Sequence, residues 1–283
     1  MATFTNQATL RYNGNVVNSN ITTGELLEVL SATKTAVIDT YNQGSDITYV
    51  INIVNSGAIA FTGLSLTDNL GEYPFGVGTL VPLDYVAGSV RYYVNGVLQP
   101  APAVAPGPPL VISGLNVPAN GVTTVIYVAR ANQYAPLDLG SVITNTAVIS
   151  GGGVTEITVT ETVTPESGVR LTIAKSLCPA TVTENGMITY TFVIQNTGNT
   201  PAVATDNVEI TDTFNPILSG ITVTFNDVVW TEGVNYTYSE VTGDFATIPG
   251  QITIPAATYT QDPVTGEWSI EPGVGVLTVT GTV

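Results

Sequence analysis

Histidine is absent from this 283-residue chain, lysine occurs only twice and cysteine only once. Without histidine, the chain lacks the commonest general base and the commonest metal ligand of proteins. The one cysteine, Cys178, permits no disulfide bond within the chain, so a free thiol and a link between two chains are the open alternatives. Six Lys and Arg against 22 Asp and Glu give a formal charge of −16, which disfavours binding to nucleic-acid phosphates.

Long apolar stretches and common catalytic motifs are also missing. No run of about 18 apolar residues occurs, so we expect no membrane span. Residues 1–4 lead straight into strand-like sequence, without the basic and apolar regions of a classical secretory signal. We find no Gly-x-Ser-x-Gly, no phosphate loop and no Asp-rich loop with calcium-site spacing. The sequence therefore predicts no cofactor, no metal site and no enzyme that acts on a separate substrate.

What the chain does contain favours strands and tight turns over helices. Thr, Val, Ile, Tyr, Asn and Gly dominate, and short alternating apolar runs are separated by turn signals. This pattern predicts an all-β protein built from β-sandwich domains, and 283 residues suffice for two of them. We expect a hairpin over residues 4–24 around Asn13-Gly14. Further strands are expected at residues 28–37, 46–55, 62–70, 122–130, 141–150 and 154–164. Residues 89–99 are expected to form a strand or hairpin arm with a turn at Asn95-Gly96, and residues 100–109 a proline-rich surface loop.

The strand pattern then begins again, which indicates an internal duplication. Ile188-Thr189-Tyr190 repeats Ile47-Thr48-Tyr49 at an offset of 141 (188 − 47), and the two lysines, Lys34 and Lys175, have the same spacing. We therefore expect a hairpin at residues 1–27, one immunoglobulin-like sandwich at 28–165 and a second at 166–283.

The repeated residues resemble a known family. Ile-Thr-Tyr, Asn-x-Gly, Thr-Asp and Ile-Thr-Asn-x-Ala are similar to the surface-protein repeats called domain of unknown function eleven. The resemblance covers nearly the whole chain and implies immunoglobulin-like sandwiches. Members that open with a lone closing hairpin imply fibres on cells or spores, and the family name implies no activity.

One strand pair is expected at the head of the chain instead of at its tail. Phe4-Thr5-Asn6-Gln7-Ala8 repeats Ile143-Thr144-Asn145-Thr146-Ala147 at an offset of 139 (145 − 6), yet no such stretch follows the last strand of the second domain. A sandwich without closing strands exposes apolar core and unpaired backbone groups. We predict that the hairpin of one subunit, through Phe4, Asn6, Ala8 and Leu10, completes the second domain of its neighbour. The alternatives are closure onto its own second domain and a role as an edge cap on the first.

Three polar residue types share strand faces with apolar neighbours in each half. In the first domain these are Lys34, Asp68 and Asn145, and in the second Lys175 and Asp212, with Asn6 supplied by the hairpin. Strand alternation predicts that each set is buried, and an unpaired buried charge is costly.

One chemistry accounts for all three residue types. In an apolar pocket a lysine amine loses its proton more readily and a carboxyl group keeps its proton. The amine then attacks the asparagine carboxamide, releases ammonia and forms an isopeptide bond, while the aspartic acid promotes the reaction. The strand order resembles that of self-crosslinking collagen-adhesin-type domains. The alternative is a buried Lys–Asp ion pair beside a hydrogen-bonded Asn, with no covalent bond.

Together these features predict a structural subunit of a self-assembling fibre, located outside the cell or on a spore surface. Its partner would be a second copy of the chain, joined head to tail. The alternative is an adhesin whose loops, such as 100–109, grip a target. Trp230, Trp268 and the tyrosines 236, 238 and 259 make the second half richer in aromatics, and both core packing and ligand contact are open for them.

Overall fold

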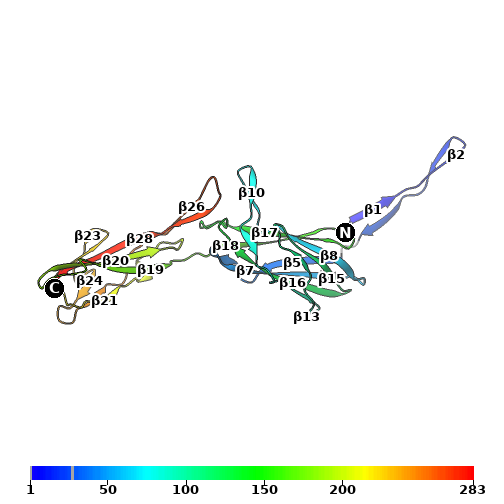
Figure 1. Cartoon of the computed structure of the whole chain (residues 1–283). Coiled ribbons are helices and arrows are strands. Elements are labelled where there is room, and N and C mark those ends of the chain that lie inside the picture. Colours follow the sequence, from blue (N-terminus) through cyan, green and yellow to red (C-terminus); the bar gives the residue numbers. More distant parts are fainter. Residues whose placement is uncertain (1, 27–28) are drawn as a thin grey trace. The chain divides into compact units, whose positions relative to one another are not determined.

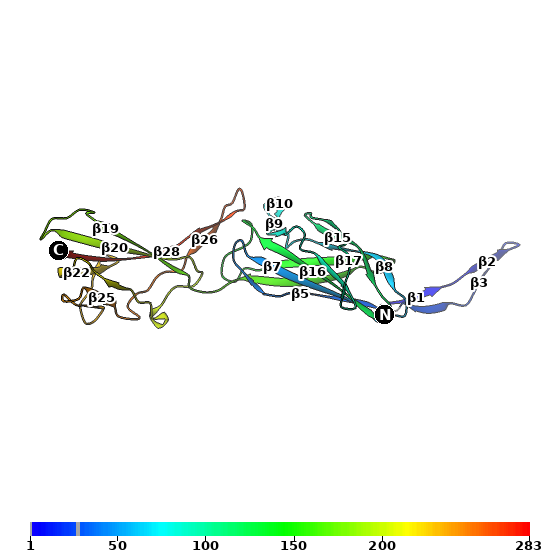
Figure 2. The same cartoon turned by 60° about the horizontal axis from the view of Figure 1, so that its bottom comes forward.

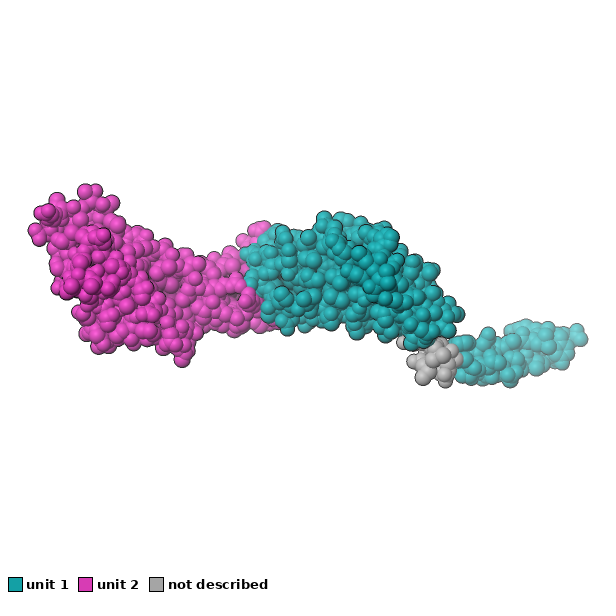
Figure 3. Space-filling model, turned by 90° about the horizontal axis from the view of Figure 1, so that it is seen from below, with its two compact units in different colours: residues 1–135, 142–163 teal, residues 136–141, 164–283 magenta. Residues whose placement is uncertain are grey.

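The computed structural model describes residues 2–26 and 29–283, and it confirms an all-β architecture (Figure 1). Two compact units are distinguished in Figure 3: residues 1–135 with 142–163, and residues 136–141 with 164–283. The helical structure among the described residues is one turn of 3₁₀ helix, Ala204–Asp206. None of the described residues belongs to a helix with the length and hydrophobicity to cross a membrane.

The first unit is a sandwich of two antiparallel sheets. One sheet has the order β13-β12-β16-β7-β5, with β11 also paired to β16. The other has the order β14-β15-β8-β17-β18-β6. The bounds in the first sheet are β5 (Leu30–Ala36), β7 (Asp46–Asn55), β11 (Leu83–Tyr85), β12 (Arg91–Val94), β13 (Val97–Leu98) and β16 (Gly121–Ala131). Those in the second are β6 (Thr40–Tyr41), β8 (Phe61–Asp68), β14 (Ala103–Ala105), β15 (Leu110–Val117), β17 (Ile143–Gly151) and β18 (Ile157–Pro165), and a separate small hairpin is formed by β9 (Tyr73–Phe75) and β10 (Gly78–Leu80).

Strict alternation along the central strands builds the core of this unit. On β7 every second residue points inward, and Tyr49, Ile51 and Ile53 have no exposed surface. Their neighbours on β16, Val125 and Tyr127, are equally buried. β-branched and aromatic side chains fit such a pleated, covered surface well, so this pattern specifies the register of the sheet.

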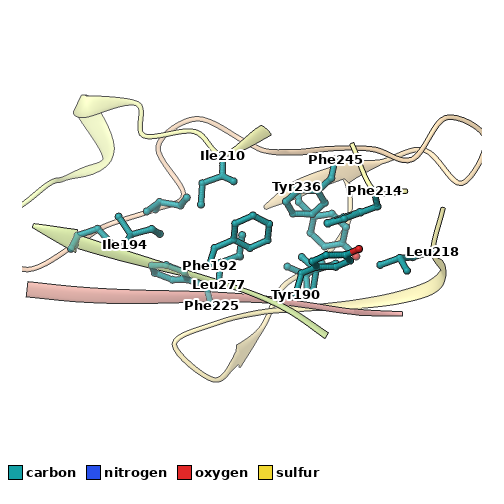
Figure 4. Close-up of a cluster of buried hydrophobic side chains, with 14 of the residues drawn as sticks. Tyr190, Phe192, Ile194, Ile210, Phe214, Leu218, Phe225, Tyr236, Phe245 and Leu277 are labelled. Atoms are coloured by element: carbon teal, nitrogen blue, oxygen red, sulfur yellow. The ribbon is translucent and has the colours of Figure 1, made fainter. Parts of the chain in front are cut away.

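The second unit repeats the first sheet but only part of the second. Its larger sheet has the order β19-β20-β28-β22-β23, which matches β5-β7-β16-β12-β13 strand for strand. Its smaller sheet is β21-β25-β24 and matches β8-β15-β14. The bounds are β19 (Leu171–Cys178), β20 (Met187–Asn196), β21 (Thr211–Thr213), β22 (Ser219–Phe225), β23 (Val228–Val229), β24 (Tyr236–Tyr238), β25 (Asp244–Thr247) and β28 (Gly273–Thr282), with a separate hairpin of β26 (Thr258–Gln261) and β27 (Trp268–Glu271). Figure 4 shows the aromatic core between these two sheets.

The two units differ at the free edge of the smaller sheet. In the first unit β8 pairs with β15 on one side and with β17 on the other, and β18 follows β17. In the second unit β21 pairs with β25, and within residues 166–283 no strand pairs with its other edge. This edge of β21 therefore has open backbone hydrogen-bonding groups.

The N-terminal residues form the expected hairpin (Figure 2). Strand β1 (Ala2–Asn6) pairs with β4 (Thr22–Leu26), and β2 (Thr9–Tyr12) pairs with β3 (Asn15–Asn18). Asn13 and Gly14 have φ of 42° and 79°, the left-handed conformations that a two-residue hairpin turn requires. Three residues, 19–21, lie opposite residues 7 and 8, so the extra residue belongs to the returning arm.

The proline-rich stretch 100–109 is not entirely a loop, which corrects part of our expectation. Its centre forms β14, which pairs with β15 as an edge strand. The prolines stand on either side of this short strand, where no ladder hydrogen bond is needed from them.

Candidate functional site

The first unit contains a buried charged cluster between its two sheets. Lys34 on β5 places its Nζ 2.7 Å from Oδ2 of Asp68, at the end of β8, and donates to the backbone oxygen of Asn145, on β17, at 2.9 Å. The side chains of Lys34 and Asp68 have no exposed surface, and Asn145 is fully buried. The structure thus brings together the lysine, aspartate and asparagine that the sequence singled out in this half.

A tyrosine that the sequence analysis did not identify completes the cluster. The hydroxyl of Tyr127 donates to Oδ2 of Asp68 at 2.5 Å, and Nδ2 of Asn145 donates to the same hydroxyl at 3.3 Å. The backbone N–H of Leu70 donates to the second oxygen of Asp68 at 2.9 Å. Oδ1 of Asn145 is buried without a hydrogen-bond partner. The amide oxygen therefore lacks the donor that a buried polar group normally has.

Burial changes the acid–base behaviour of this cluster. Loss of water lowers the pKa of Lys34 from 10.5 to about 8, and the nearby Asp68 carboxylate opposes that shift. Near neutral pH a fraction of Lys34 is therefore an uncharged, nucleophilic amine. Burial also raises the pKa of Tyr127, so that its hydroxyl stays protonated. These groups can support attack of a lysine amine on the Asn145 carboxamide.

The second unit contains the same lysine and aspartate in an open setting. Lys175 on β19 pairs with Oδ2 of Asp212 on β21, and its Nζ lies 4.5 Å from the ring centroid of Tyr190. Its side chain is 39% exposed and that of Asp212 is 18% exposed. Our expectation that this set is also buried was wrong for the described chain. The physical reason is the empty edge of β21, because in the first unit β17 covers the corresponding position.

A separate open groove of about 480 Å³ runs across the smaller sheet, over β21, β25 and β24. It is lined by Thr211, Asp212 and Thr213 from β21, by Asp244, Phe245 and Ala246 from β25, and by Thr237. On the facing sheet, Ile173 of β19 is 56% exposed and Leu177 is 44% exposed. The inner face of the second sandwich is therefore accessible along the line that β17 occupies in the first.

The hairpin exposes the residues that its counterpart β17 buries. Ile143, Asn145, Ala147 and Ile149 are at most 1% exposed. Their counterparts in the hairpin are Phe4 and Leu10, which are 59% and 63% exposed, and Asn6 and Ala8, which are also exposed. The side chain of Asn6 thus lies in solvent, and its backbone oxygen accepts from Thr22 at 3.2 Å.

Several aromatic residues of the second half belong to its core. Trp230 packs on Phe225 with ring centroids 5.2 Å apart, and Tyr236 stacks on Phe245 at 5.6 Å. The hydroxyl of Tyr238 donates to the backbone of Leu218. Core packing therefore explains Trp230, Tyr236 and Tyr238 without a ligand.

Comparisons with known proteins give resemblances of fold only. No family model and no curated protein sequence matches the chain. The major pilin subunit of Bacillus cereus aligns at 12% identity and a TM-score of 0.35, over 96% of this chain and 73% of that one. The pilus backbone protein of Streptococcus pneumoniae aligns at 12% identity and 0.33, over 86% of this chain and 55% of that one. The collagen-binding subdomain of an Enterococcus faecalis surface protein aligns at 8% identity and 0.31, over 50% of this chain and 99% of that one.

Because these scores are low, function is inferred below from the residues of this chain. The resemblance to the repeat family of unknown function eleven stays a prediction.

Proposed function

We propose that this protein is the subunit of a fibre that grows by strand donation. The hairpin of one subunit enters the open edge of β21 in the second unit of the next, where it takes the place that β17 and β18 occupy in the first unit. The observation that carries this proposal is that an open sheet edge in one unit and an exposed apolar hairpin elsewhere in the chain complement each other. Within the described residues no closing strand pair lies at the edge of β21, and a hairpin with the sequence signature of that pair exposes its apolar face.

Energetics favour the joined state. An isolated two-stranded hairpin is marginally stable in water, and an open sheet edge is a template for a further strand. Burying Phe4 and Leu10 contributes about 1.5–3 kcal/mol for each side chain, before the cost of association. Each chain carries one donor and one acceptor on different surfaces, so the contacts are head to tail and do not close on themselves unless a ring forms.

The joint is proposed to become covalent. Once the hairpin is inserted, Asn6 takes the position of Asn145 and meets Lys175 and Asp212. The uncharged Lys175 amine attacks Cγ of Asn6, the new Cγ–Nζ bond replaces the Cγ–Nδ2 bond, and ammonia leaves. The same reaction within the first unit would join Lys34 to Asn145. We propose a structural role outside the cell or on a spore surface, with no separate substrate, cofactor or metal.

Two matched substitutions on the hairpin test strand donation. Leu10→Asp places a charge on the face that would be buried, whereas Thr5→Asp places one on the face whose counterpart, Thr144, is exposed. We expect fibres, measured by sedimentation, to be lost with Leu10→Asp and kept with Thr5→Asp. Equal assembly of both variants would overturn the proposal, because the two faces would then be equivalent.

Denaturing gel electrophoresis tests the covalent lock separately. Fibres boiled with reductant should run as a ladder of multimers, and Asn6→Ala should run as monomer while still forming fibres. A single monomer band from wild-type fibres would remove the covalent step and leave strand donation standing. Reduction excludes Cys178 as the source of the ladder.

A further inference from the structure

Arg11 is the one basic side chain in the described residues that has neither an ion pair nor a hydrogen bond. The chain has six Lys and Arg in all. Lys34, Lys175, Arg130 and Arg170 each pair with a carboxylate, and Arg91 donates to backbone carbonyls. An unpaired cation is conspicuous in a chain with a formal charge of −16. It lies on β2, in the arm that we propose to be donated.

The internal duplication gives the register that this arm would adopt. In the first unit β17 pairs with β8 so that Ala147 lies opposite Asp68 and Ser150 lies opposite Ser65. Asp68 corresponds to Asp212 at an offset of 144 (212 − 68), so Ser65 corresponds to Glu209. Asn145 corresponds to Asn6 at an offset of 139, so Ser150 corresponds to Arg11. Where the first unit has Ser150 opposite Ser65, the joint between two subunits would therefore have Arg11 opposite Glu209.

The local structures on both sides preserve this correspondence. On the acceptor, Val208, Ile210 and Phe214 alternate inward as Leu64, Leu66 and Leu70 do, so Glu209 faces outward and is exposed. On the donor, the extra residue of the hairpin lies in the returning arm, at 19–21, so the alternation from Phe4 to Tyr12 is unbroken. Arg11 therefore lies on the face opposite to Leu10 and away from the core.

Charge favours the same match. Residues 1–26 contain one basic residue, Arg11, and one acidic residue, Glu25, so the remaining residues carry the whole formal charge of −16. The segment that leads into β21 carries the acidic residues Asp206 and Glu209, and Asp212 of β21 pairs with Lys175. A neutral donor with one correctly placed cation avoids the repulsion that two acidic sandwiches would otherwise experience.

We propose that Arg11 of one subunit pairs with Glu209 of the next and fixes the register of the donated strand. Directly opposed residues on neighbouring antiparallel strands have Cβ atoms about 4.5–5.5 Å apart, within reach of an arginine–carboxylate pair. A one-residue slip would place Leu10 in solvent and bring Arg11 toward the core. The pair therefore acts together with the apolar face to select a single register. This inference rests on the proposed strand donation.

A charge swap tests the pair. Arg11→Glu and Glu209→Arg should each slow fibre elongation at low salt by roughly tenfold, because each places like charges opposite one another. The double variant Arg11→Glu with Glu209→Arg should elongate close to the wild-type rate. Added salt should reduce all these differences, since the pair is exposed. Elongation is followed by light scattering on the full chain.

Glu209→Arg separates a specific pair from general repulsion. It reduces the net negative charge, from −16 to −14 (−16 + 2), so general repulsion alone predicts faster assembly. The pair predicts slower assembly. Faster assembly of this variant, or a double variant no better than the single ones, would overturn the pair. If wild-type chains form no fibres at all, strand donation itself fails, which is a distinguishable result.

Discussion

At the residue scale, the unusual feature is a lysine whose side chain has no exposed surface and whose amine is held by one carboxylate and one backbone carbonyl. Lys34 bonds to Asp68 and to the oxygen of Asn145, and Tyr127 shares the carboxylate. Breaking a buried ion pair by removing one partner costs about 3–5 kcal/mol. Formation of an amide bond removes the buried ammonium, and the cluster then holds no unpaired charge when Asp68 takes up the released proton.

Mass spectrometry tests the reaction in the first unit. Loss of ammonia lowers the mass by about 17 Da for each bond formed. We expect this deficit in the wild-type monomer and its absence in Lys34→Ala and in Asn145→Ala. An intact mass equal to that of the sequence would favour a buried ion pair without a covalent bond.

The pH dependence of stability distinguishes the bonded and unbonded states. In Asn145→Ala, Lys34 stays an amine, and burial holds its pKa near 8 against 10.5 when unfolded. The unfolded chain then binds more protons between these values, so the free energy of unfolding should rise with pH, by about 2 kcal/mol from pH 8 to pH 10. In the bonded wild type Lys34 no longer titrates, so this rise should be absent.

Tyrosines limit the useful range of that experiment. Burial raises the pKa of Tyr41, Tyr49 and Tyr127 above the ordinary value near 10. Their ionisation in the unfolded chain destabilises the fold above about pH 10. Chemical denaturation at pH 8, 9 and 10 therefore suffices, and equal slopes in the two proteins would contradict the account.

At the element scale, the contrast between β8 and β21 shows how a neighbour determines strand length. β8 runs over eight residues between two partners, whereas β21 has three residues and one partner. Residues 208–210, which correspond to 64–66, are not in a strand. Residues 208 and 209 lie past the end of β25 on one side, and on the other side the described residues of this unit provide no partner strand.

Hydrogen exchange should therefore change along this segment on assembly. We expect the amides of Glu209 and Thr211, which alternate with Ile210 and Phe214 that bond toward β25, to exchange rapidly in the monomer and to be protected in fibres. Strands β20 and β28, which pair with each other over ten residues, serve as the internal control and should be protected in both states. Unchanged exchange of the Glu209 and Thr211 amides in fibres would contradict strand insertion at β21.

The sequence predicted much of this architecture because alternation and turn chemistry act locally. The Asn13-Gly14 turn, the strand starting near Asp46 and the repeat of Lys34 as Lys175 are visible without coordinates. Tyr127 was missed because the second unit does not repeat it. In the first unit Tyr127 lies opposite Tyr49 on the neighbouring strand, whereas in the second unit Val279 lies opposite Tyr190. The exposure of Lys175 was also missed, since it depends on a strand that is absent from its own domain.

At the scale of the whole molecule, assembly must bring together subunits that carry a large net negative charge. Subunits with a formal charge of −16 repel at long range, and this repulsion is screened within about 10 Å at 0.1 M salt. The neutral hairpin and its apolar face provide the short-range attraction, and Arg11 provides a local charge match. We therefore expect moderate salt to promote assembly of the wild-type chain.

Negative-stain electron microscopy of the purified chain, beside a variant that lacks residues 1–24, tests the central claim most directly. The account predicts fibres from the full chain and separate, folded monomers from the variant. Circular dichroism of the variant should show that its sandwiches remain folded. Separate monomers from both proteins would contradict the account and would indicate that the hairpin closes its own molecule or caps its own first domain.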